Sequence, residues 1–372
     1  MKKKQIVPLA CLAAILAGCG RAPDDGSADF EKGKAAYAAR DLKNAVKHLS
    51  QSVKACSTNL EAHITLALAN LALGDVAAAD GAVKAARALA PDSAEALLAD
   101  AETGWVARDF ARAKACYSAV ANAAQLSARL RSQAYSSRAV VELAENGFDV
   151  ARISLWRAMR LDRRNAAAWY HLGILSRDTW KFDDAALQQF TMASRLLDPA
   201  SDRARDVLRN VIPALRDSVS RAAATKPGVT ARNPGAAAKL IAEGEALVAK
   251  KQTTKALKKF AAAYEADRFS YPAAWNYAKM LAATEKTAAG VDKTLAVYSA
   301  AMDAKPMSQA TSLAAARYAY VNKRWATAVK ILNRALAYDP ESKQVVRLYV
   351  DSLIKAGDTK TAALYQAWLK EL

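Results

Sequence analysis

The sequence has few of the side chains that build catalytic or metal sites. It contains only three histidines, His48, His63 and His171, and none has a second histidine or a cysteine at metal-ligand spacing. It has no glycine-rich phosphate loop and no GxSxG turn, and its acidic residues are scattered singly rather than framed as a general acid and base. We therefore expect no enzyme activity, no metal site and no cofactor.

The chain also lacks the patterns of a sheet. No segment shows sustained two-residue alternation of apolar and polar side chains bounded by turn residues. Glycine and proline are scarce, with 14 and 10 residues among 372, and the apolar content is rich in alanine. This composition favours an all-helical fold.

The first residues resemble a bacterial lipoprotein signal. Three lysines, Lys2 to Lys4, precede an apolar run at residues 6–15 that is too short to span a bilayer. The sequence Leu-Ala-Gly-Cys then ends at Cys19 and resembles a lipobox, in which the cysteine is acylated. We expect a signal peptide at 1–18 and a polar tether at 19–28. By resemblance to enteric lipoproteins, glycine after the cysteine points to a lipid anchor in the outer membrane, facing the periplasm.

The remaining chain repeats a motif with a period of 34 residues. In residues 61–92, two apolar helical patterns flank a Gly74-Asp75 turn, and Pro91 ends the second. A small residue marks the point where the second helix crosses the first, and we name these the crossing residues. Six of them keep the 34-residue spacing in two runs: Ala45, Ala79 and Ala113, then Thr294, Ala328 and Ala362. Between the runs the spacing loosens, through Ala151, Ala185 or Ala186, and Ala256.

Other positions keep the same register. Small residues lie twelve before a crossing residue, where the first helix must come close: Gly33, Ala67, Ala101, Ala139, Gly173, Gly244 and Ala316. Large apolar residues lie four after it: Leu49, Val83, Tyr117, Leu155, Phe190, Phe260, Tyr298 and Leu332. Two segments, 178–184 and 284–290, are longer than the motif allows, and we expect loop bulges there.

This pattern resembles the tetratricopeptide repeat (TPR) family. The resemblance implies an all-α, right-handed superhelical solenoid of about nine TPR-like helix-turn-helix repeats in two blocks. We place an N-terminal array at 29–199 and a C-terminal array at 237–372. Between them, 200–236 reads as a helix, with Pro213 kinking it, followed by a Pro/Gly linker.

In this family the first helices line a concave groove that binds partners. The resemblance assigns to it Trp105, Tyr170, His171, Asn276, Tyr277, Arg317, Tyr320 and Arg347. Aromatic and arginine side chains are typical of binding hot spots. The alternative is that several of them pack between repeats, as we expect for Trp169 and Trp275.

Positive charge is concentrated after the middle of the chain. The formal net charge is +18, and residues 201–260 hold 13 Lys and Arg against five Asp and Glu. Five lysines form a basic patch: Lys250, Lys251, Lys255, Lys258 and Lys259. The patch suits an anionic lipid, a glycan or an acidic protein, and the alternative is a solvated helix face.

These features predict a non-enzymatic, lipid-anchored periplasmic scaffold that holds protein partners in a cell-envelope assembly or secretion machine. The alternative is an accessory lipoprotein for polysaccharide binding or exopolysaccharide export, since aromatic groove residues and the basic patch would suit an acidic glycan. The export signal argues against a nucleic-acid partner.

Overall fold

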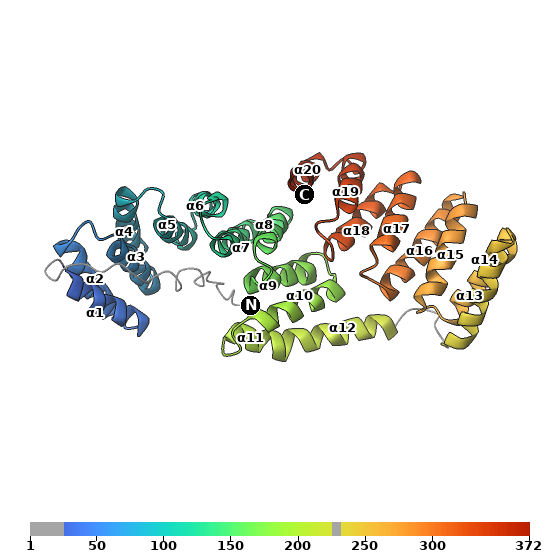
Figure 1. Ribbon diagram of the computed structural model, residues 1–372, viewed down its shortest axis with the longest axis horizontal. Helices are drawn as coiled ribbons and strands as arrows, with labels where there is room; N and C mark the ends of the chain where they lie inside the picture. The colour runs from blue at the N-terminus through green and yellow to red at the C-terminus, as the bar shows by residue number, and fades with distance from the viewer. Residues whose placement is uncertain (1–25, 225–231) are drawn as a thin grey trace. The chain divides into compact units, whose positions relative to one another are not determined.

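The computed structural model describes residues 26–224 and 232–372, which form helices joined by short turns with no strand among them (Figure 1). The predicted signal peptide and Cys19 therefore lie outside the described residues, as do residues 225–231 of the predicted linker. The all-α prediction is confirmed.

The chain divides into two compact units. Unit 1 comprises the described residues of 1–172 together with 192–198, and unit 2 comprises those of 173–191 and 199–372. Our array boundaries rest on repeat register rather than on compactness, and they stay a prediction.

The helices of unit 1 form consecutive pairs in which each helix packs on the next. Among the first helices, α3 also contacts α1 and α5. The bounds are α1 (Ser27–Ala38), α2 (Leu42–Ala55), α3 (Leu60–Leu73), α4 (Val76–Leu89), α5 (Ala94–Val106), α6 (Phe110–Asn122), α7 (Ala128–Ala144) and α8 (Phe148–Leu161).

The middle of the chain contains a fifth helix pair and one long interrupted helix. The pair is α9 (Ala166–Ile174), extended by the π-helical turn η1 (Leu175–Thr179), and α10 (Asp183–Leu196). The long helix consists of α11 (Asp202–Asp206), the π-helical turn η2 (Val207–Val211) and α12 (Ile212–Ala224).

Four further pairs complete unit 2, so the described residues contain the nine repeats that the sequence predicts. Their bounds are α13 (Pro234–Ala249), α14 (Thr253–Ala266), α15 (Tyr271–Thr284), α16 (Ala288–Ala304), α17 (Gln309–Val321), α18 (Trp325–Leu336), α19 (Lys343–Ala356) and α20 (Thr359–Glu371).

The crossing residues are buried in every pair, and eight of the ten candidates named above are alanines with no exposed surface. The glycines twelve residues earlier are needed for close approach. A Cβ on Gly33 would lie 2.6 Å from Leu49 Cγ, and one on Gly244 would lie 2.6 Å from Phe260 Cε1. Helix contact therefore explains why the register requires a small residue opposite a large one.

The turn inside a pair holds one residue in the left-handed conformation, five residues before the crossing residue. Among the described pairs, eight share this feature with φ between 56° and 89°, although only two of the eight are glycine: Arg40, Gly74, Arg108, Asn146, Lys181, Lys251, Lys323 and Gly357. Because the left-handed residue of the fifth pair is Lys181, the crossing residue of α10 is the residue five later, Ala186, and not Ala185.

The two expected loop bulges are instead absorbed by helices. The extra residue near 178–184 lies in the π-helical turn η1, because a π turn accommodates one additional residue inside a helix. The loop before α16 is no longer than the loop before α14, three residues in each case. The extra residues extend α16 at its N-terminus, so that Thr294 is its seventh residue, whereas Ala256 is the fourth residue of α14.

The helix predicted after residue 200 is present and spans 202–224. The π-helical turn η2 comes directly before α12, whose second residue is Pro213. Proline has no N–H group to donate to the carbonyl four residues earlier, and a π turn changes the hydrogen-bond pattern at that point. Proline therefore alters this helix locally without ending it.

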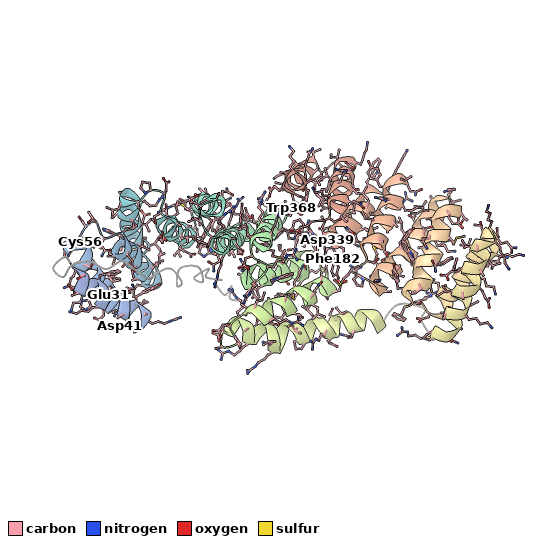
Figure 2. The ribbon with its side chains drawn as sticks, in the orientation of Figure 1. Glu31, Asp41, Cys56, Phe182, Asp339 and Trp368 are labelled. Carbon is pink, nitrogen blue, oxygen red and sulfur yellow. The ribbon has the colours of Figure 1, made fainter. Side chains whose placement is uncertain are left out.

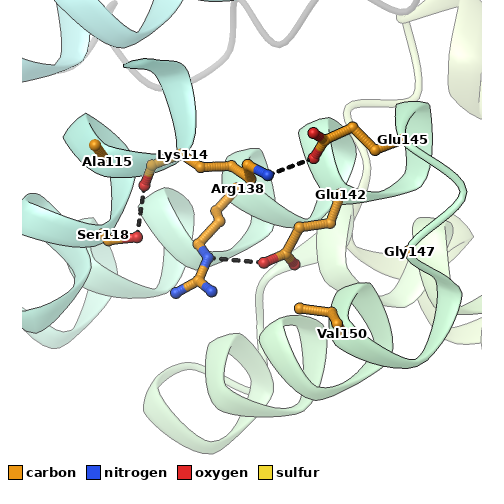
Figure 3. Close-up of a pocket in the computed structure, with 8 residues that line it drawn as sticks. All are labelled: Lys114, Ala115, Ser118, Arg138, Glu142, Glu145, Gly147 and Val150. Atoms are coloured by element: carbon orange, nitrogen blue, oxygen red, sulfur yellow. Dashed lines mark hydrogen bonds and ion pairs between the residues drawn. The ribbon is translucent and has the colours of Figure 1, made fainter. Parts of the chain in front are cut away.

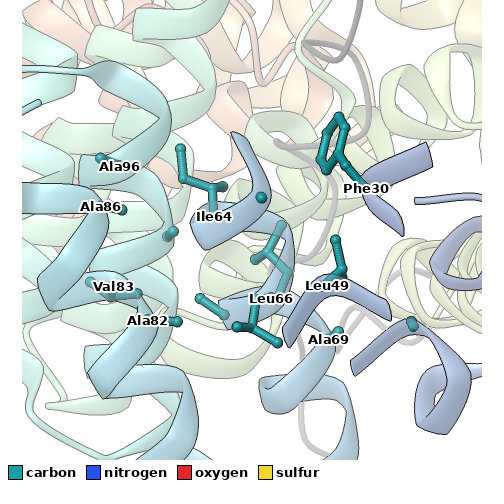
Figure 4. Packing of buried hydrophobic residues seen from close by; sticks show 14 residues of the cluster. Phe30, Leu49, Ile64, Leu66, Ala69, Ala82, Val83, Ala86 and Ala96 are labelled. Carbon is teal, nitrogen blue, oxygen red and sulfur yellow. The ribbon is translucent and has the colours of Figure 1, made fainter. Parts of the chain in front are cut away.

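The core of unit 1 lies between successive pairs (Figure 4). Phe30 of α1 and Leu49 of α2 join a cluster that includes Ile64 and Leu66 of α3 and Val83 of α4. Small alanines fill the places between these side chains, which lets the helices approach closely.

Candidate binding surface

Three predicted groove residues are available at the surface of unit 2. Arg317 and Arg347 are exposed, and Tyr320 is half-buried. No carboxylate among the described residues pairs with either arginine, whereas Arg324, at the start of α18, donates to both oxygens of Asp292.

Two exposed apolar side chains lie on the same first helices. Val321 at the end of α17 is 76% exposed and Ile354 on α19 is 48% exposed. Sequence reasoning missed them, although Ile354 lies eight residues before its crossing residue, as Tyr320 does. Since α17 contacts α19, the first helices of the last two repeats present cationic, aromatic and aliphatic groups on neighbouring elements.

The other two unit 2 candidates have partners inside the fold. Asn276 donates to Glu245 of the preceding first helix at 3.2 Å. Tyr277, expected in the groove, is buried against Tyr264, with ring centroids 5.7 Å apart. Because the fully buried Ala278 takes the close-approach position in α15, Tyr277 points inward.

The candidates in unit 1 offer less surface. Trp105 is half-buried with its ring centroid 5.7 Å from that of Phe110. His171 is buried, and the half-buried Tyr170 meets its ring edge-on at 5.3 Å. Only Trp105 and Tyr170 therefore keep partial access to solvent.

The two tryptophans expected to pack inside the array are half-buried. Trp275 lies 6.1 Å from Tyr298 of α16 and stacks on Tyr271 at 6.3 Å, measured between ring centroids. The Trp169 indole donates to the carbonyl of Arg163 at 2.9 Å. Both contacts are internal to one unit.

The predicted basic patch lies in the turn between α13 and α14 and on the first two turns of α14. Lys250, Lys251, Lys255 and Lys258 are exposed, and no ion pair joins them to any described carboxylate. Lys259 is different, because its ammonium lies 2.6 Å from the Glu243 carboxylate.

A buried carboxyl group that sequence reasoning did not single out for this role lies in unit 1. Glu102 of α5 is 5% exposed and accepts a hydrogen bond from the Tyr117 hydroxyl at 2.7 Å. Burial raises the pKa of Glu102 to about 7, although the hydrogen bond from Tyr117 opposes this. The sequence offers no signal for it, because a glutamate on a first helix is usually solvated.

A second missed feature joins α10 to α18 within unit 2. Arg334 lies 2.6 Å from Asp184 and 2.8 Å from Asp303, and the Gln189 amide donates to the carbonyl of Ala337. Burial alone would raise the pKa of Asp184, but the Arg334 guanidinium outweighs it and holds that pKa below its usual value. The pair spans 150 residues, so no repeat period could reveal it.

The two cysteines outside the predicted signal region are both free thiols. Cys116 is buried and donates to Asp100 at 3.4 Å. Burial raises the pKa of the Cys116 thiol to about 12, and Asp100 adds to the shift. Cys56 follows the end of α2 (Figure 2) and is half-buried.

A pocket of about 320 Å³ lies where α6, α7 and the start of α8 meet (Figure 3). Its charged groups neutralise one another: Lys114 lies 2.6 Å from Glu145, and Arg138 donates to Glu142 at 2.8 Å. No predicted site residue lines it. Its charged side chains are already paired.

The described residues show no cluster of three His, Cys, Asp or Glu side chains able to hold a metal ion. Among them, no helix combines the length and apolar character needed to cross a membrane.

Comparison with known proteins identifies the repeat directly in the last part of the chain. A tetratricopeptide repeat family model matches residues 313–372, a segment that begins within α17 and contains α18 to α20. No curated protein matches the sequence.

Several solved structures resemble the chain at low identity. PilF of Pseudomonas aeruginosa is 14% identical, with a TM-score of 0.44, and the match covers 54% of this chain and 93% of the PilF chain. PilW, a type IV pilus biogenesis factor, is 15% identical with a TM-score of 0.42, and the match covers 55% of this chain and 97% of the PilW chain. MamA of Desulfovibrio magneticus RS-1 is 17% identical with a TM-score of 0.40, and the match covers 47% of this chain and 96% of the MamA chain.

The matched segment and the other described helix pairs share one construction. The crossing residues are buried in all nine described pairs, eight of these pairs have a left-handed turn residue, and contacts between successive first helices occur in both units. Residues 313–372 therefore contain tetratricopeptide repeats, and the other described helix pairs share their construction.

Proposed function

We propose that the chain is a non-enzymatic scaffold that holds an extended acidic segment of a protein partner on the first helices α17 and α19. The observation that carries this proposal is the pair of exposed arginines, Arg317 and Arg347, which no described carboxylate neutralises. Carboxylates of a partner would form charge-assisted hydrogen bonds with them. Tyr320, Val321 and Ile354 would cover apolar side chains of the same segment.

The test compares two double variants that remove the same charge. Arg317→Ala with Arg347→Ala changes the first helices, and Lys330→Ala with Lys360→Ala changes exposed lysines on the second helices α18 and α20. The probe is a fluorescent peptide of alternating glutamate and leucine, titrated by anisotropy. Each lost charge-assisted bond is worth about 1.5–3 kcal/mol, so the arginine variant should bind at least about tenfold more weakly. Equal losses in both variants would contradict the proposal.

We further propose that the scaffold is attached by a lipid on Cys19 to the outer membrane and faces the periplasm, within a cell-envelope machine. The support is the sequence alone: three lysines, a short apolar run and the Leu-Ala-Gly-Cys motif. Metabolic labelling with a fatty acid tests it, with Cys56→Ala as the control. Label should disappear in Cys19→Ala and persist in Cys56→Ala, and label retained in Cys19→Ala would exclude Cys19 as the anchor.

A further inference from the structure

The turn between α13 and α14 and the first two turns of α14 concentrate unpaired positive charge. Lys250, Lys251, Lys255 and Lys258 are all exposed. The sequence contains no Asp or Glu at 246–264. The two nearest preceding carboxylates are already engaged, since Glu243 pairs with Lys259 and Glu245 accepts from Asn276. The lysines therefore face solvent without a counter-charge from neighbouring described side chains.

An exposed apolar side chain accompanies these lysines. Val248, two residues before Lys250, is 46% exposed. In the α13 helix only Ala237 and Gly244 are buried, because α13 packs on α14 and α15 at the start of this run of repeats. We define Val248 and the four unpaired lysines as the hairpin surface.

We propose that the hairpin surface docks on an anionic lipid membrane. Lysine carries a compact charge on a long flexible stem and needs no fixed geometry, which suits headgroup phosphates that move within a fluid plane. An acidic protein partner would favour arginine forks and aromatic anchors, and the hairpin surface has neither. Val248 would enter the boundary between headgroups and acyl chains.

This inference concerns a surface other than the α17–α19 face, and the two proposals can fail separately. Each lysine near an anionic surface contributes about fivefold to binding. Reversing two of them should therefore weaken binding by at least about twentyfold, and raised salt should release the parent chain because exposed charges are screened.

The experiment uses the full chain carrying Cys19→Ala, so that no acyl group contributes, in co-sedimentation with lipid vesicles. The vesicles contain phosphatidylethanolamine with phosphatidylglycerol, and phosphatidylcholine vesicles provide the neutral baseline. The test variant is Lys255→Glu with Lys258→Glu. The matched control is Lys43→Glu with Lys47→Glu, two exposed lysines on α2 that give the same change in net charge.

The proposal predicts loss of binding to anionic vesicles in the test variant, near-parent binding in the control, and equal helical circular dichroism in both. Arg317→Ala with Arg347→Ala should bind vesicles as the parent does. Equal losses in test and control variants, or parent-like binding in the test variant, would overturn it.

Two further measurements distinguish binding to a membrane from binding to other anions. Val248→Ser should weaken vesicle binding severalfold while leaving binding to soluble polyglutamate unchanged. Competition by millimolar inorganic phosphate at constant ionic strength would indicate a discrete phosphate site instead. Binding to polyglutamate but not to vesicles would indicate an acidic protein, and either result contradicts the proposal.

Discussion

Two first helices of similar apolar character, α3 in unit 1 and α13 in unit 2, have opposite environments. Every residue from Ala62 to Asn70 of α3 is buried, whereas α13 buries only Ala237 and Gly244. The α3 helix contacts α1, α2, α4 and α5, while α13 packs on α14 and α15. Burial in a repeat array is therefore decided by neighbours rather than by the composition of one helix.

Charged side chains also differ in burial between the two units. Unit 1 encloses a carboxyl group, Glu102, whereas unit 2 leaves Arg317, Arg347 and the lysines of the hairpin surface in solvent. An enclosed group affects stability, and an exposed unpaired group is available to a partner. We therefore expect pH to act mainly on unit 1 and ligand binding mainly on unit 2.

The largest expected effect comes from breaking the contact between α10 and α18. Arg334→Ala leaves Asp184 and Asp303 without their shared cation, and Asp184 is largely buried. Removing one partner of a buried pair costs about 3–5 kcal/mol, so about 3 kcal/mol is expected for this partly exposed pair. Hydrogen exchange measured by mass spectrometry should show faster exchange in α10 and α18.

Helices α3 and α5 of unit 1 should keep their exchange rates in that variant. The control is Arg205→Ala, whose carboxylate partner Asp202 is almost fully exposed, and it should change little. Faster exchange throughout both units would mean that the two units do not unfold separately.

The fold was predictable because its determinant is local and periodic. Two helices can cross closely only where one has a small side chain, and this need recurs every 34 residues at Ala45, Ala79 and Ala113. The surface was less predictable. Counting from Trp275 placed Tyr277 in the groove, but the buried face of α15 consists of Ala273, Ala274, Tyr277, Ala278 and Leu281, so Tyr277 faces inward.

Contacts between distant repeats could not be predicted. The ion pair of Asp184 with Arg334 depends on how α10 approaches α18, and charge pairs follow no period. The left-handed turns escaped notice for a different reason. Glycine marks only Gly74 and Gly357, while lysine, arginine and asparagine occupy the other six positions.

A somewhat smaller effect should come from the pH dependence of unit 1. The pKa of Glu102 is about 7 in the fold against 4.5 for a free glutamate. Between these values the folded state holds a proton that the unfolded state has lost, so stability falls as pH rises through this window. The decrease should be about 2–3 kcal/mol between pH 4.5 and pH 8.

Urea denaturation followed by circular dichroism measures this loss of stability between pH 4.5 and pH 8. Glu102→Gln keeps an acceptor for the Tyr117 hydroxyl and cannot ionise, so it should match the parent at low pH and exceed its stability at pH 8. Glu142, whose pKa burial also raises, leaves some pH dependence in both proteins. An unchanged pH profile in the variant would show that Glu102 ionises normally.

The next prediction uses the close-approach glycines of both units. Gly33→Ala and Gly244→Ala bring a methyl group against Leu49 and Phe260, and overpacking of this kind costs about 1–3 kcal/mol. Each change should speed hydrogen exchange in its own unit only. Gly81→Ala on α4 is the control, because nothing lies within 4 Å of the added Cβ, and it should stabilise by about 0.5–1 kcal/mol. Destabilisation by all three would show that glycine itself, rather than helix contact, matters.

The smallest expected effect concerns the left-handed turns. Arg108 in unit 1 and Lys323 in unit 2 have φ values of 62° and 58°, which cost a residue with a Cβ about 1–2 kcal/mol. Replacing either by glycine removes that cost, partly offset by the greater freedom of glycine in the unfolded chain, so each change should stabilise by about 0.5–1 kcal/mol. Lys330→Gly, inside α18, should instead destabilise by about 1 kcal/mol because its backbone is helical. The urea midpoints of the three variants test this prediction. Stabilisation at both Arg108 and Lys323 would mean that both units use the same turn, despite the different environments of their first helices. Destabilisation at either position would mean that the side chain there contributes more stability than the backbone strain costs.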